Sequence, residues 1–196
     1  MTFTVGVVLE EFELTDDALD AIFTALPDAV PSDIAGLVTV TAPVEADDPE
    51  TAAFALIERL AQAVPGAVPA RLDQDLVSIP DVAERVGRSR ESVRLLVEGR
   101  RGPGGFPAPV GTVGDGIRVW PWASVLGWFA SALGEDLGER GVPPEAAAVV
   151  DSCLSARRRL RHHQRVQWSD GVTAIKRTNA DRNPYRVRSA TGALVA

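Results

Sequence analysis

The chain has 196 residues, a hydrophobic content of 45% and a formal net charge of −7, so it can build one large or two small domains with real cores. It contains a single cysteine, Cys153, and no apolar run of about 18 residues, which excludes an intramolecular disulfide and predicts no membrane-spanning helix. Residues 1–75 hold 15 acidic residues against two arginines, a balance of −13, whereas residues 76–196 hold 12 acidic and 18 basic residues, a balance of +6, so DNA would be repelled by the first part only.

Residues 1–74 predict an acidic α+β domain. Strand and helix patterns alternate along it, with expected strands at 3–9, 28–34, 37–44 and 67–72 and expected helices at 15–26 and 49–64. The order β-α-β-β-α-β predicts a ferredoxin-like sandwich. Helical periodicity predicts two buried faces, one formed by Leu19, Ile22, Phe23 and Leu26, the other by Phe54, Ile57, Leu60 and Ala61.

Two short helices that meet at a glycine are expected next. Ser78 can cap the first helix, with Asp81 three residues later, and Gly87 suits a sharp turn. Ser89 can cap the second helix, which Gly99 ends. The buried sides are expected to be Val82, Ala83 and Val86 on the first helix, and Val93, Leu96 and Val97 on the second. Short helices joined in this way predict a helix-turn-helix.

The residues in and after this pair resemble a known DNA-binding family. The order Val82-Ala83-x-x-Val86-Gly87-x-Ser89-x-x-Ser92-Val93-Arg94 resembles the start of MerR-type regulators, and residues 105–110, 114–120 and 122–128 are similar to the wing and following helix of MerR-like, AlpA and excisionase-type proteins. The resemblance covers about residues 76–130. It implies a winged helix-turn-helix over residues 75–133, with the helix from Ser89 in the major groove and the wing near the DNA backbone. The wing departs from the basic wings of that family, since it offers Arg118 and also holds Asp115.

The expected DNA contacts follow from these positions. They are Arg88, Ser89, Arg90, Ser92, Arg94, Arg100, Arg101 and Arg118. For Arg94 an ion pair with Glu91 or Glu98 is the alternative. Base stacking by Trp120, Trp122 and Trp128 is less favoured than a role in the core, and the same holds for Phe106.

The last part of the chain predicts a helix over residues 142–168 and a flexible, basic tail over residues 169–196. The helix opens on Pro143-Pro144-Glu145 and becomes arginine-rich from Arg157 to Arg165. That arginine run can bind phosphates, fold back on the acidic first domain, or remain solvated.

No catalytic, metal or cofactor site is expected. Cys153, His162 and His163 do not have the spacing of a closed metal site. Gly102-Pro103-Gly104-Gly105 lacks the Lys-Ser/Thr of a phosphate-binding loop. The expected function is therefore not enzymatic.

These observations predict a sequence-specific binder of double-stranded DNA, used as a bacterial transcriptional regulator. One reading helix gives limited affinity, so a homo-oligomer or cooperative assembly on DNA is expected. The alternatives are an excisionase-like architectural DNA-binding protein, or an interaction module in which the winged fold is only a scaffold and the first domain binds a protein or small ligand. A start without basic residues, together with Glu10, Glu11 and Glu13, predicts no signal peptide, and hence a cytoplasmic, nucleoid-associated location without membrane contact.

Overall fold

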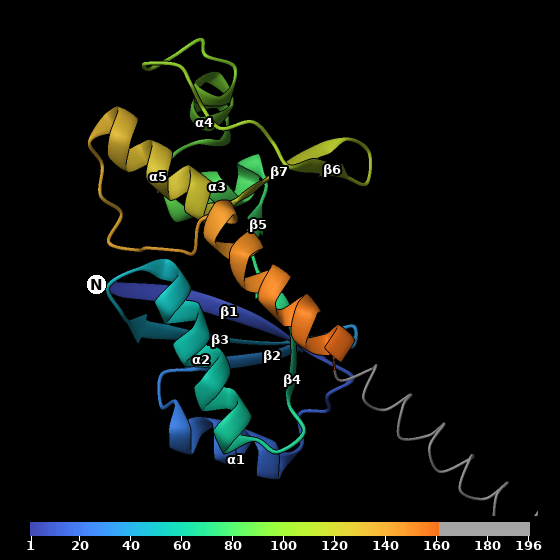
Figure 1. Cartoon of the computed structure of the whole chain (residues 1–196). Helices are drawn as coiled ribbons and strands as arrows, with labels where there is room; N and C mark the ends of the chain where they lie inside the picture. Colours follow the sequence, from blue (N-terminus) through green and yellow to red (C-terminus); the bar gives the residue numbers. More distant parts are fainter. Residues whose placement is uncertain (161–196) are drawn as a thin grey trace, which may run out of the picture. The chain divides into compact units, whose positions relative to one another are not determined.

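The computed structural model describes residues 1–160 and has an α+β fold with two antiparallel sheets. Residues 1–155 form one unit, and a second unit begins at Ala156. All labelled helices and strands in Figure 1 belong to the first unit. The tail predicted over residues 169–196 and the end of the predicted 142–168 helix lie outside the described residues.

The first sheet has four strands in the order β2-β3-β1-β4. Its elements are β1 (Thr2–Glu10), α1 (Asp16–Ala25), β2 (Val30–Ile34), β3 (Leu37–Glu45), α2 (Pro49–Ala63) and β4 (Val68–Asp73). The predicted elements of this part are thus confirmed to within a few residues. Thr15 and Asp48 cap the two helices by accepting hydrogen bonds from the backbone N–H groups of Ala18 and Thr51.

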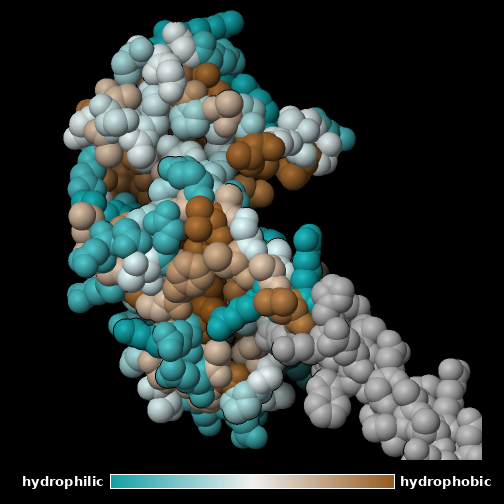
Figure 2. All heavy atoms as spheres, in the orientation of Figure 1, coloured by the Kyte–Doolittle hydropathy of each residue, from teal (hydrophilic) through white to brown (hydrophobic). Residues whose placement is uncertain are grey.

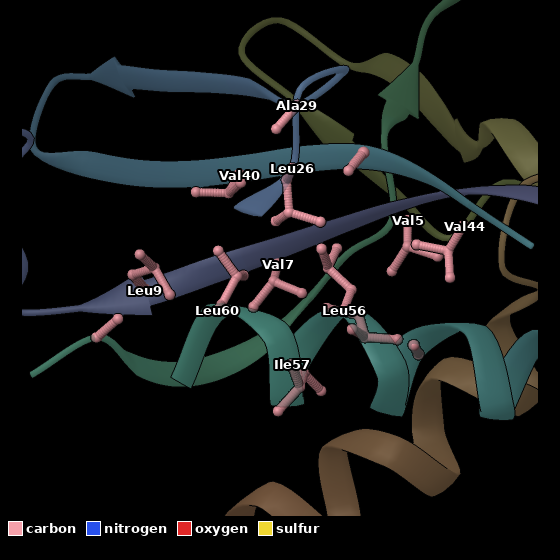
Figure 3. Packing of buried hydrophobic residues seen from close by; sticks show 14 of the residues in the cluster. Val5, Val7, Leu9, Leu26, Ala29, Val40, Val44, Leu56, Ile57 and Leu60 are labelled. Carbon is pink, nitrogen blue, oxygen red and sulfur yellow. The ribbon is translucent and has the colours of Figure 1, made fainter. Parts of the chain in front are cut away.

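One face of this sheet and the helices α1 and α2 enclose the first core. Alternate residues of β1 point into it, and Figure 3 shows Val7 beside Leu56 and Leu60 of α2. All three are fully buried. Residues 144–160 are helical, and Ala147, Val150 and Leu154 of that helix also belong to this core.

The predicted buried faces of the two helices are partly wrong. Ile22, Leu26, Ile57 and Leu60 are buried as expected, but Phe23 is 45% exposed, Phe54 is 40% exposed, and Ala61 is exposed. On α2 the small residues Ala52 and Ala53 take the buried positions instead. Ala52 and Ala53 lie on the same face of α2 as Leu56 and Leu60, and Phe54 lies off that face.

The second core lies between a smaller sheet and three helices. Its elements are β5 (Leu76–Val77), α3 (Ile79–Arg85), α4 (Arg90–Val97), β6 (Gly111–Val113), β7 (Ile117–Pro121) and α5 (Trp122–Leu133), with the strands in the order β5-β7-β6. The strand β5 was not expected from the sequence. The helix α5 contains residues 122–128, where the resemblance places the helix that follows the wing, and residues 134–140 form neither helix nor strand.

Aromatic residues fill this second core. Trp120, Trp122 and Trp128 are at most 7% exposed, which confirms that they are core residues. Phe106 packs against the rings of Trp120 and Trp128, with centroid distances of 5.8 and 4.9 Å. These contacts join the segment after α4 to α5 and β7.

The face of α2 that packs on the sheet can be tested directly. We expect Leu56→Ala to lower the free energy of unfolding by about 2–5 kcal/mol, because it leaves a cavity at a fully buried position. Phe54→Ala removes a larger side chain, yet it is expected to cost less than half as much, since Phe54 is partly exposed. Chemical denaturation of both variants measures the difference. Equal losses, or a larger loss for Phe54→Ala, would show that α2 presents the other face to the sheet.

Candidate nucleic-acid interface

The helices α3 and α4 begin at the residues that the sequence predicts. The backbone N–H and the hydroxyl of Ser78 both donate to the Asp81 carboxylate, at 2.8 and 2.6 Å. Ser89 accepts a hydrogen bond from the backbone N–H of Ser92 at 3.2 Å. Local side-chain caps therefore define where both helices start.

Glycines define the turn between the helices and the end of the second one. Gly87 has a φ of +62° and Gly99 a φ of +66°, a backbone conformation that is unfavourable for residues with a Cβ. Val82 and Ala83 of α3 and Val93 and Leu96 of α4 are buried, as expected, whereas Val86 and Val97 are only partly buried. The buried sides of the two helices meet in the second core, so the other side of α4 is left to solvent.

Arg94 is ion-paired on the exposed side of α4. Its guanidinium donates to both carboxylate oxygens of Glu91, at 2.9 and 2.6 Å, and to Glu98 at 2.7 Å. These hydrogen bonds raise the pKa of Arg94 above its usual value and lower the pKa of Glu91. The ion-pair alternative for Arg94 is therefore present, with both glutamates at once. Exposed ion pairs are weak and are screened by salt, so a phosphate or base can displace either partner.

The other predicted contact arginines in and next to α4 fall into two groups. Arg88 and Arg100 are ion-paired, the first with Glu135 and the second with Glu98 at 3.2 Å. Arg88 also lies over the ring of Phe129. Arg90 and Arg101 are exposed. Neither guanidinium makes a hydrogen bond or an ion pair with another group of residues 1–160.

The segment that follows α4 is fixed by indole N–H groups. Trp128 donates to the carbonyl oxygen of Gly104 at 3.1 Å, and Trp120 donates to that of Pro107 at 2.9 Å. The backbone N–H groups of Arg100 and Arg101 both donate to the carbonyl of Leu95. This places two arginines directly at the end of α4 without a helix or strand of their own.

The hairpin formed by β6 and β7 carries an exposed aliphatic pair beside its turn. Val113 pairs with Ile117 across the hairpin, and they are 51% and 53% exposed. Figure 2 shows hydrophobic atoms at this hairpin. Arg118 points to the other face, where its guanidinium lies 5.6 Å from the centre of the Trp120 ring. The small number of basic residues in the hairpin is visible in the sequence, but the exposed aliphatic pair was not predicted from it.

Among residues 1–160, no three or more His, Cys, Asp and Glu side chains come together to hold a metal ion. His162 and His163 lie outside that range. No helix of the described part is long and apolar enough to cross a membrane. No family model, curated protein or solved structure matches the chain.

The cap of α3 predicts a pH dependence. Hydrogen bonds from the Ser78 side chain and backbone lower the pKa of Asp81, so its stabilising effect is fully present above the ordinary Asp pKa of about 3.9 and is lost as the pH falls through the lowered value. We expect Asp81→Ala to cost about 0.5–1 kcal/mol at neutral pH, at the low end for helix caps because this one is exposed. Denaturation at pH 7 and at pH 2.5 measures the loss, with Asp20→Ala as the control. A loss of equal size at both pH values would contradict the assignment.

Proposed function

We propose that this chain is a sequence-specific DNA-binding protein used in bacterial transcriptional regulation, with a winged helix-turn-helix over residues 75–133. The observation that carries the proposal is the capped pair α3 and α4, joined at Gly87, with the N-terminal turn of α4 exposed at Ser89 and Arg90. A helix N-terminus attracts phosphate, and a neighbouring arginine can read guanine in the major groove. Arg101, held at the end of α4, supplies a second cation for the backbone.

The first domain is proposed to be ferredoxin-like. The strand order β2-β3-β1-β4, with both α1 and α2 contributing to the core on one face, supports this arrangement. The fold alone names no activity. Its acidic composition gives it no affinity for phosphate, and we assign it to a partner other than DNA.

A second candidate is a protein-interaction module in which the surface of residues 75–133 contacts protein and not DNA. The exposed pair Val113 and Ile117 and the carboxylates beside Arg94 favour it, because both features suit a protein surface better than a phosphate backbone. An architectural, excisionase-like role shares the DNA contacts of the first proposal. The positions of binding sites on DNA distinguish it from regulation.

The proposal is tested by selection from random duplex DNA at near-physiological salt, comparing the wild type with Arg90→Ala/Arg94→Ala. We expect a defined sequence motif with the wild type and its loss with the double variant. Arg59→Ala, which removes an exposed arginine from α2, is the matched control and should enrich the wild-type motif. No motif, or the same motif with the double variant, would rule out sequence reading by α4. DNA binding without sequence preference, and with an affinity that depends only weakly on salt concentration, would favour the interaction module.

Glu91 on α4 and Glu98 at its C-cap are expected to limit DNA affinity. Glu91→Gln/Glu98→Gln removes two negative charges and both ion-pair partners of Arg94. We expect this variant to bind DNA more tightly, and the salt dependence of log K to steepen by about 1, as for one added phosphate contact. Fluorescence anisotropy over a salt series measures both quantities. Glu58→Gln, on the exposed face of α2, controls for a general loss of negative charge, and an equal change in both variants would contradict the prediction.

A further inference from the structure

A cavity of about 330 Å³ lies on the face of the four-stranded sheet opposite its core. Its other wall is formed by the start of α5 and by the chain around Glu139 and Gly141. Both walls belong to the unit formed by residues 1–155. The volume is in the range of small-molecule sites.

The floor of the cavity is one row of residues across the sheet. The strand registers place Val30, Thr41, Gly6 and Asp73 side by side, one from each strand. The neighbouring side chains close over Gly6, since a Cβ there would lie only 3.0 Å from the Cβ of Asp73 and 3.2 Å from Oγ1 of Thr41. The glycine thus lets the side chains of Asp73, which is exposed, and Thr41, which is half-buried, come close together on the floor of the cavity.

The opposite wall is apolar and held in place. Trp122, Ala123 and Leu126 of α5 line it. The Trp122 indole N–H donates to the Glu139 carboxylate at 2.8 Å, and the Arg85 guanidinium lies 4.9 Å from the centre of its ring. A ligand would therefore meet a preformed apolar surface, which reduces the entropy lost on binding.

The polar lining determines the charge of the ligand. Three carboxylates line the cavity, those of Asp73, Asp75 and Glu139, and no Lys or Arg is among the lining residues. Arg85 neutralises Asp75 through two hydrogen bonds of 2.5 and 2.9 Å. Glu139 accepts from a neutral indole, and the Asp73 carboxylate accepts only a long hydrogen bond of 3.4 Å from the backbone N–H of Asp75 among the described contacts. Arg85 also attracts Glu139, so one guanidinium faces three carboxylates. The balance of charge around the lining stays negative, which disfavours anionic ligands and favours cations.

We propose that this cavity binds a small organic cation, a primary amine on a compact apolar body. The ammonium group lies at Asp73, with Thr41 as a further acceptor, and the apolar body packs on Trp122 and Leu126. The proposal concerns the cavity alone and does not depend on DNA binding.

Three probes with the same apolar body and different head groups test the proposal on the full chain. They are 2-phenylethylamine, the neutral 2-phenylethanol and the anionic 3-phenylpropanoate, each titrated by calorimetry up to 5 mM. We expect the amine to bind at least tenfold more tightly than the alcohol, and the carboxylate not to bind. Equal binding of all three probes, or no binding of the amine at 5 mM, would overturn the proposal.

Variants then locate the binding. Asp73→Asn should weaken binding of the amine at least tenfold and leave binding of the alcohol unchanged, while Asp20→Asn, an exposed carboxylate on α1, should alter neither. Val30→Phe, at the edge of the cavity floor, should weaken both probes by filling space. The melting temperature without probe verifies that each variant folds. Undiminished binding of the amine to Asp73→Asn would show that it binds the acidic surface elsewhere. Loss of DNA binding in the selection experiment would leave these results unchanged, so the two proposals fail separately.

Discussion

Three buried indole N–H groups determine the path of the irregular segments around α5. A buried donor needs an acceptor, and the acceptors here are the carbonyls of Gly104 and Pro107 and the carboxylate of Glu139. None of these lies in a helix or strand. Burying the tryptophans of β7 and α5 therefore fixes both the segment that follows α4 and one wall of the cavity. The need to give each buried indole N–H an acceptor thus positions the segment that carries Arg100 and Arg101 at the end of α4. The same need positions Glu139 in the wall of the cavity.

The elements could be predicted from the sequence because their signals are local. Caps such as Ser78 and Ser89 and the glycine Gly87 act within a few residues, so the positions of α3 and α4 follow from them. The buried face of a helix also depends on what covers it. Hydrophobicity favours Phe54 as a core residue of α2, but the sheet accepts the small side chains of Ala52 and Ala53, and Phe54 faces water.

The candidate sites could be predicted only in part. The partners of Arg94 were foreseeable, since Glu91 and Glu98 lie three and four residues away on one helix. The partner of Arg88 is Glu135, 47 residues along the chain, and no local pattern indicates it. The cavity floor depends on the register of four strands around Gly6. A glycine in a strand indicates a close approach of other groups, but sequence alone does not say which groups approach.

Under the proposed function, the distribution of charge suggests that different parts of the chain attract DNA and recognise its base sequence. On α4 the charges of Arg90 and Arg94 are balanced by Glu91 and Glu98, so this helix adds little long-range attraction for DNA. Net positive charge instead comes from Arg101 and from the arginines that follow residue 156 in the sequence. Residues 1–75 carry a balance of −13 and repel phosphate. Attraction would then bring DNA to residues 76–196, while the exposed arginine and cap of α4 act only at contact distance. Under the two proposals, the acidic excess of residues 1–75 would both repel DNA and, through Asp73 and Asp75, favour a cation in the cavity.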